Sequence, residues 1–365
     1  MKKILLKHLP SYILPVCALL TVFFLTPSCV TVGLDAVSGS TLIWNSGSNN
    51  YFNREAYTTL QGPKKLVIDG EVEQATEIKL SKFPLRTVTV KEAMYCKEGD
   101  SIAFLGAFRY EGYALCDILS AVKVDKESKE DLWPPIDLYI EVRNDAGDTA
   151  VFSWGELFYT ANMYGVVVAK RVTRVIPGKT GELWNLPTEM KLIAATDLVS
   201  VRNIPCPTHI TIRSLKGNYI VDRAPEVLEN DPGRLAIQMS LQDTAAVLTS
   251  LPKGLPTLTY PVLFYGNSTG YKGMREYSGL MLRDVLAPWF PADDYKTIQT
   301  GMLSVAGVDG FRAAFSVSEI VNRNDHREIL LRQDGTSFAI YTACDAFADR
   351  SIKGLSEIRL TDSEN

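Results

Sequence analysis

An internal repeat constrains the fold of this chain more than any other feature of its sequence. Three blocks of the first half recur in the same order in the second half, with several identical residues in register. The matching blocks are YEGYALCDIL (110–119) with YSGLMLRDVL (277–286), VRNDAGDTAVFSWGEL (142–157) with VAGVDGFRAAFSVSEI (305–320), and AATDLVSVRNIPCPTHITI (194–212) with TACDAFADRSIKGLSEIRL (342–360). This pattern predicts a tandem duplication, and its period is too long for a solenoid.

The repeat and the local composition divide the chain into four segments. Residues 1–29 are predicted to be a signal peptide ending in a lipobox-like sequence. Residues 30–63 are rich in Gly, Ser, Thr and Asn, which predicts a flexible tether. Residues 64–214 and 215–362 are the two copies, and each is long enough to bury a core of its own.

Each copy combines strand-like and helix-like patterns. Two β-rich runs around Asn-Asp-Ala-Gly predict a hairpin over 138–153, and apolar residues at helical spacing predict a helix over 112–122. A serine followed three residues later by a glutamate predicts a capping box in both copies, at Ser153–Glu156 and Ser316–Glu319. We therefore predict an α+β fold made of two tandem mixed-sheet domains.

The N-terminus has the features of a targeting segment. Lysines precede an apolar stretch over 12–25 that is short for a membrane span. It leads into LTPSC (25–29), which resembles a bacterial lipobox and predicts lipidation of Cys29. A signal peptide without lipid and an uncleaved anchor are the alternatives. All three place the bulk of the chain outside the cytoplasm, and we expect a membrane-anchored protein of the periplasm or cell surface.

Composition argues against several classes of function. The net charge is −4 and the chain has no run of Lys and Arg, so nucleic acid is not an expected partner. Beyond the predicted signal peptide only His209 and His326 remain, which argues against a zinc site with several ligands. The remaining cysteines are scattered, and their pairing is left open. They are Cys96, Cys116, Cys206 and Cys344.

The order of these parts resembles the molybdopterin-binding domain of sulfite oxidase and its relatives. The resemblance covers most of both copies and rests on a succession of short motifs. The motifs are an opening I-x-G-x-V at Ile68, Gly70 and Val72, a strand leading to Cys96, the helix starts over 110–119 and 277–286, a D-G-F hairpin at Asp309, Gly310 and Phe311, and a closing stretch with Arg350, Ile352, Lys353, Leu355 and Ile358.

The resemblance implies a role for Cys96, because the family's cysteine at this place is the protein ligand of molybdenum. A thiolate is a soft donor that suits such a metal, and Glu98 becomes the candidate catalytic or supporting residue beside it. The second copy, however, has no cysteine in its matching segment over 262–270. We therefore expect no bound cofactor, with molybdenum–molybdopterin in the first copy as the alternative. An inert buried cysteine and a redox-active thiol are the other interpretations of Cys96.

Six basic residues are candidates for binding the anionic part of a ligand such as a pterin phosphate. Three lie in the most basic stretch of the mature chain, where the alternative is a solvated strand face. Two belong to an Asp-Arg pair that recurs in both copies, where the alternative is an ion pair needed for folding. The six are Lys170, Arg171, Arg174, Arg202, Arg350 and Lys353.

We therefore expect an extracytoplasmic, membrane-anchored protein with two degenerate molybdopterin-oxidoreductase-like domains, acting as a binding or accessory module. Its expected site is the inter-domain groove, which would receive a protein partner or a small ligand. One alternative is a molybdopterin-dependent oxidoreductase that uses Cys96 as the metal ligand. A second alternative is a structural envelope lipoprotein. Whether the protein is an enzyme is left open.

Overall fold

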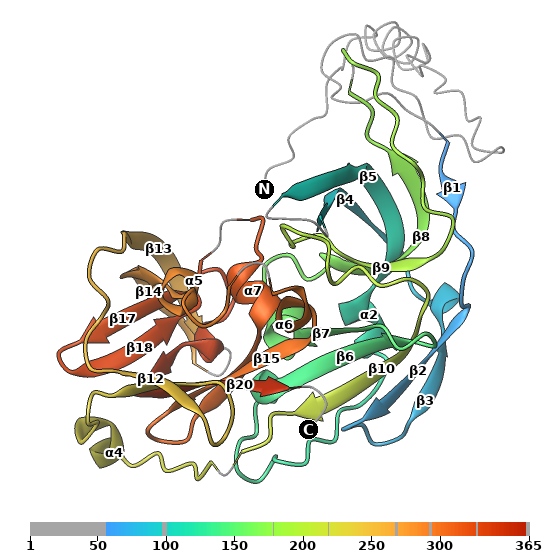
Figure 1. The fold of residues 1–365 in the computed structure, drawn as a ribbon. Helices are drawn as coiled ribbons and strands as arrows, with labels where there is room; N and C mark the ends of the chain where they lie inside the picture. Colours follow the sequence, from blue (N-terminus) through green and yellow to red (C-terminus); the bar gives the residue numbers. More distant parts are fainter. Residues whose placement is uncertain are drawn as a thin grey trace, which may run out of the picture.

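The structure, a computed structural model, describes residues 56–96, 101–177, 179–217, 219–266, 269–291, 294–325 and 328–362. Strand makes up 48% and helix 14% of the structure. Within the described residues the strands form four five-stranded sheets in a four-bladed, propeller-like arrangement (Figure 1).

The first half of the chain supplies two of these sheets. One has the strand order β3-β2-β10-β6-β7, and the other has the order β1-β8-β5-β4 with β9 paired to β8. Their strands are β1 (Thr58–Thr59), β2 (Lys65–Gly70), β3 (Thr76–Lys79), β4 (Leu85–Tyr95), β5 (Ile102–Ala114), β6 (Leu138–Asn144), β7 (Thr149–Ser153), β8 (Val166–Arg174), β9 (Lys191–Ala194) and β10 (Pro207–Ser214).

The second half supplies the other two sheets. Their strand orders are β12-β11-β20-β15-β16 and β13-β14-β17-β18-β19. The strands are β11 (Leu235–Gln238), β12 (Thr244–Leu248), β13 (Thr257–Gly266), β14 (Gly270–Met281), β15 (Gly301–Gly307), β16 (Arg312–Ser316), β17 (Leu330–Asp334), β18 (Ser337–Tyr341), β19 (Ile352–Lys353) and β20 (Leu355–Asp362).

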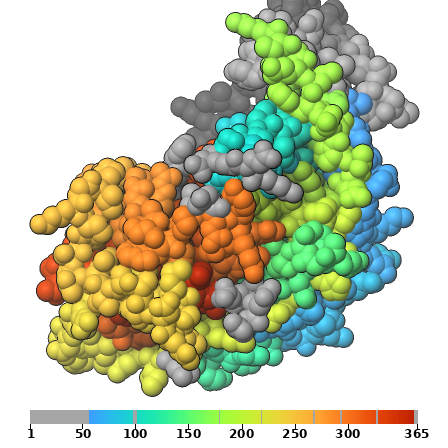
Figure 2. All heavy atoms as spheres, in the orientation of Figure 1, coloured from blue at the N-terminus to red at the C-terminus, as the bar shows by residue number. Residues whose placement is uncertain are grey.

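The two halves use the same strand pairings. In each half a parallel pair, β2–β10 or β11–β20, is extended by antiparallel strands on both sides. The long hairpins β4–β5 and β13–β14 also occupy matching places in the chain and in their sheets. Figure 2 shows the halves packed side by side, and the core of the second half includes Tyr159, Val199 and Val201 from the first. The halves therefore share buried apolar surface.

The predicted α+β fold, with tandem mixed-sheet domains of the sulfite-oxidase type, is wrong. Strand greatly exceeds helix, and the helices are short segments next to strands. They are α2 (Leu115–Leu119), α3 (Trp154–Phe158), α4 (Pro225–Glu229), α5 (Leu282–Leu286), α6 (Tyr295–Thr300), α7 (Val317–Val321) and the 3-10 turns η2 (Leu80–Lys82), η3 (Pro135–Asp137) and η4 (Ala348–Arg350).

The helix predicted over 112–122 is shorter than expected, and the reason lies in the apolar spacing on which the prediction rested. Residues 112–114 belong to β5 and pair with β8, and α2 begins only at Leu115. One helical turn is enough to bury Leu115, Ile118 and Leu119, so helical spacing over so few residues does not require a long helix. In contrast, the hairpin β6–β7 and both capping boxes are confirmed.

The described residues contain no helix long and apolar enough to cross a membrane. The predicted signal peptide, with Cys29, and most of the predicted tether lie outside the described residues.

Candidate functional site

Two buried arginines form the centre of the contact between the halves. Arg202 donates from Nε and Nη2 to the carboxylate of Asp197, at 2.8 and 2.6 Å, and from Nη1 to Glu156 Oε1 at 3.0 Å. The same Nη1 donates to the Ser316 hydroxyl of the second half at 3.2 Å. Because Glu156 also closes the capping box of α3, one carboxylate fixes both the helix start and the guanidinium.

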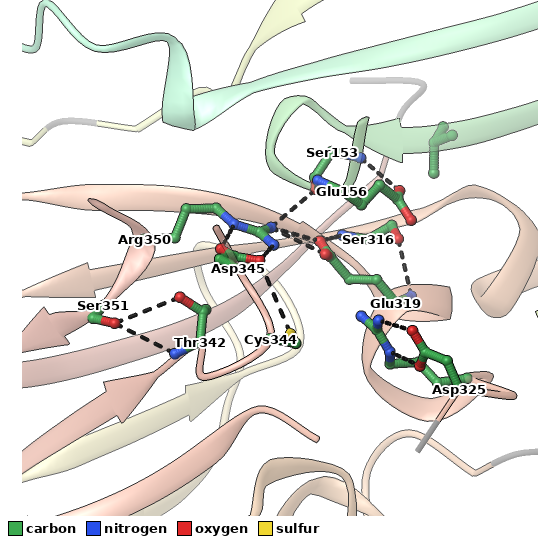
Figure 3. A network of polar contacts seen from close by, with 12 residues as sticks. Ser153, Glu156, Ser316, Glu319, Asp325, Thr342, Cys344, Asp345, Arg350 and Ser351 are labelled. Carbon is green, nitrogen blue, oxygen red and sulfur yellow. Dashed lines mark hydrogen bonds and ion pairs between the residues drawn. The ribbon is translucent and has the colours of Figure 1, made fainter. Parts of the chain in front are cut away.

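Arg350 repeats this arrangement in the second half (Figure 3). It donates from Nε and Nη2 to Asp345, at 2.8 and 2.9 Å, and from Nη1 to Glu319 Oε2 at 3.0 Å. Nη1 also donates to the Ser153 hydroxyl of the first half at 3.2 Å. Each arginine therefore binds acids of its own half and the N-cap serine of the opposite half, so we define Arg202, Arg350 and these partners as the crossed network.

Gly155 of the first half packs directly against the Arg350 side chain. A Cβ added to Gly155 would stand 2.3 Å from Arg350 Cδ and Nε, much closer than real side chains approach. The matching residue of the repeat is Ser318, whose hydroxyl donates to Asp197 at 3.3 Å. Glycine at 155 therefore serves the packing of the opposite half.

The crossed network contains four carboxylates and two guanidinium groups. The carboxylate side chains are all buried, and they belong to Asp197, Glu156, Asp345 and Glu319. Burial raises the pKa of Glu319, and the nearby Glu156 and Asp345 carboxylates act in the same direction, while Arg350 opposes them. A cavity of about 20 Å³ adjoins these acids, which is room for about one water molecule.

Glu319 should make the stability of the protein depend on pH. Because its pKa is raised on folding, the folded protein keeps a proton that the unfolded chain loses above the ordinary glutamate pKa. This contribution to stability is complete below the ordinary pKa and is lost as the pH rises through the raised value. Glu319→Gln should remove it. Urea unfolding at several values from roughly pH 5 to pH 8 measures how the free energy of unfolding depends on pH. The same pH dependence in the wild type and in Glu319→Gln would contradict the assignment.

A second feature of the contact between the halves is a groove of about 760 Å³. We call it the junction groove. The first half contributes the end of β10 with Arg213, residues of β6, and the segment around Glu127 and Asp131, and Lys216 follows just after β10. The second half contributes Arg312, the first residue of β16. The groove has the size of small-molecule sites in proteins.

Arg312 belongs to a buried charge cluster behind the groove. Its Nε lies 3.1 Å from Asp137 Oδ2, and Asp137 Oδ1 lies 2.6 Å from Lys126 Nζ. The Lys126 ammonium also donates to the carbonyls of Leu132 and Pro134, in addition to its ion pair with Asp137. The triad Lys126–Asp137–Arg312 therefore carries two positive charges and one negative charge.

Arg312 still has hydrogen-bonding capacity for a ligand. Its side chain is 4% exposed, and among the described residues Nε and Nη1 are buried atoms with no hydrogen-bond partner, although Nε lies in the ion pair with Asp137. Its Cζ lies 5.1 Å from the centre of the Tyr219 ring, which stacks against the guanidinium without satisfying its N–H groups. A buried cation with an unused donor at the wall of a groove is a ready site for an anion.

The predicted basic residues do not gather in one place. Lys170, Arg171 and Arg174 lie on β8, where Lys170 donates to the Leu60 carbonyl, Arg171 pairs with Glu111 and Arg174 donates to the Trp184 carbonyl. Lys353 is an exposed residue of β19. Arg202 and Arg350 both belong to the crossed network, where their donors are directed to protein acceptors.

Cys96 lies at the end of β4, where its N–H donates to the Ser101 carbonyl at 2.8 Å. Glu98 falls outside the described residues. Within the described residues no group of three or more His, Cys, Asp or Glu side chains is placed to bind a metal. Of the basic residues expected to hold the pterin phosphate, Lys170, Arg171, Arg174, Arg202 and Arg350 are engaged with protein groups.

The other cysteines are free thiols in the described residues. Burial raises the pKa of Cys344 to about 12, with Asp345 acting in the same direction. Burial likewise raises the pKa of Cys116 to about 11. Both thiols are therefore protonated and poorly nucleophilic near neutral pH.

Sequence reasoning missed Arg312, Asp137 and Lys126. Arg312 lies inside a repeated block, but the matching residue of the first copy is Thr149, so a search for shared residues passes over it. The signal that would have found it is this difference between the copies. Its contact with Asp137 joins distant parts of the chain, which local patterns do not reveal.

No family model matches this chain, and no curated protein matches it. Among solved structures, the sulfane dehydrogenase SoxCD from Paracoccus pantotrophus is similar over 86% of this chain and 81% of that chain, with 11% identity and a TM-score of 0.28. At this level of similarity neither fold nor activity transfers. The expected sulfite-oxidase-like fold is corrected by the sheet arrangement itself, and no comparison supports the predicted lipoprotein.

Proposed function

We propose that this protein is an extracytoplasmic, membrane-associated binding module whose ligand site is the junction groove. The N-terminal lysines and apolar stretch favour export. The ligand is a small molecule, or part of a larger one, that carries a carboxylate or phosphate group. The observation that carries the proposal is the buried Arg312, whose Nη1 has no hydrogen-bond partner among the described residues.

The charge balance around the groove supports an anionic ligand group. Glu141 is already paired, with Arg143 at 3.3 Å and Arg213 at 3.0 Å. Glu71 accepts from the Glu127 N–H and from Ser214. In the triad behind the groove, the Glu71 carboxylate also acts on Lys126, whereas Arg312 has Asp137 as its carboxylate partner and shares it with Lys126. A ligand anion against Arg312 would add a counter-charge of its own.

Binding measurements on the full chain in detergent test this proposal. Isothermal titration with inorganic phosphate, succinate and γ-aminobutyrate should detect binding of at least one probe, and Arg312→Gln should weaken it at least about tenfold. Arg213→Gln, at an exposed groove position, should weaken binding without affecting the fold. Arg332→Gln, in an exposed ion pair on β17, should leave binding unchanged. Absence of binding by every probe, or equal binding by Arg312→Gln, would overturn the proposal.

A further inference from the structure

We infer that the ligand of the junction groove is a zwitterion of the amino-acid class, with its anionic group at Arg312 and a cationic group at Glu127 and Asp131. This inference rests on the proposed function and specifies the ligand. It follows from which charged side chains of the groove already have an ion-pair partner in the protein and which do not.

The cationic side of the groove is formed by the end of β10 and the start of β16. Lys216 is exposed there, Arg213 is exposed and pairs with Glu141, and Arg312 lies buried beside them. Lys216 has no ion-pair partner among the described residues. This side therefore attracts a carboxylate, and the Arg312 guanidinium, which lines the groove, is the charged group for it to approach.

The anionic side is formed by the segment between α2 and η3. Glu127 and Asp131 are exposed and line the groove, and neither carboxylate makes an ion pair within the described residues. Asp125, in the same segment, differs from them in that its carboxylate forms an ion pair with Lys129 at 2.8 Å. The two free carboxylates therefore remain available for an ammonium group.

The buried triad holds both sides of the groove in place. Lys126 immediately precedes Glu127, and its ammonium forms an ion pair with Asp137 and donates to the carbonyls of Leu132 and Pro134. Asp137 in turn contacts Arg312 of the second half. The acidic segment and the arginine are thus fixed by one cluster, so a ligand that bridges them meets a site formed before it binds.

A series of probes separates the zwitterion from other ligands. Titrations of the full chain compare four probes with similar carbon chains. γ-Aminobutyrate carries one negative and one positive charge, butyrate carries one negative charge, succinate carries two negative charges, and 1,4-diaminobutane carries two positive charges. We expect γ-aminobutyrate to bind about fivefold more tightly than butyrate, since an exposed ion pair contributes up to about 1 kcal/mol. Glycine and 6-aminohexanoate then test the spacing of the two charges.

Variants assign the cationic end. The double variant Glu127→Gln, Asp131→Asn should reduce γ-aminobutyrate binding to the level of butyrate and leave butyrate binding unchanged. Glu130→Gln, in the same segment but outside the groove lining, is the matched control. Succinate binding as tightly as γ-aminobutyrate, or a double variant that behaves as the wild type, would overturn the zwitterion while leaving the proposed function intact. Failure of every carboxylate and of inorganic phosphate to bind would instead refute the proposed function.

Discussion

Arg350→Met is expected to lower the free energy of unfolding by about 3–5 kcal/mol. The substitution leaves Asp345 and Glu319 buried without their guanidinium partner, and it removes the hydrogen bond to Ser153 of the first half. Methionine fills much of the volume, so the loss reports the uncompensated charges rather than a cavity. Equilibrium unfolding in urea, followed by tryptophan fluorescence, measures the change.

The repeat provides a test of symmetry for this prediction. Arg202→Met should destabilise the protein by a similar amount, because its contacts with Asp197, Glu156 and Ser316 match those of Arg350. Arg332→Met removes an exposed ion pair with Asp334 and should cost no more than about 1 kcal/mol. If either buried arginine could be replaced at so small a cost, the crossed network would not be what joins the halves.

Asp137→Asn should have an effect of similar size, about 3–5 kcal/mol. Asp137 is fully buried and lies between Lys126 and Arg312, so its neutralisation leaves two buried cations without a counter-charge. Burial raises the pKa of Asp137, but both cations oppose that shift and favour the carboxylate. Thermal and urea unfolding of the purified variant measure the loss.

The matched control for this change is Asp125→Asn. Asp125 pairs with Lys129, four residues further along the chain, and both side chains are about half exposed. Because the pair is exposed, its loss is expected to change the free energy of unfolding far less than the loss of Asp137. Equal effects of the two substitutions would show that the triad is not a buried charge cluster.

Local features of this fold could be predicted from sequence, and long-range ones could not. The capping boxes at Ser153 and Ser316 depend on residues three positions apart, and both form as expected. The recurring Asp197–Arg202 and Asp345–Arg350 spacings also indicated ion pairs. Nothing in those spacings revealed that each arginine crosses to the N-cap serine of the other half, because that contact depends on how the halves pack.

The errors have the same physical origin. One buried turn at Leu115–Leu119 has the periodicity of a longer helix, which led to an α+β fold where strands dominate. Basic residues such as Lys170 and Lys353 were grouped by charge, although the sheets place them apart. Arg312 was overlooked because it lies where the two copies differ, and such differences are where a duplicated chain can acquire a new site.

Hydrogen–deuterium exchange on the full chain in detergent, with and without saturating γ-aminobutyrate, tests most directly whether the junction groove is the ligand site. The account predicts slower exchange in peptides that cover 126–132 and 212–217, no change in the hairpin β13–β14, and loss of the protection in Arg312→Gln. Protection confined to other parts of the chain, or protection at the groove that persists in Arg312→Gln, would contradict it.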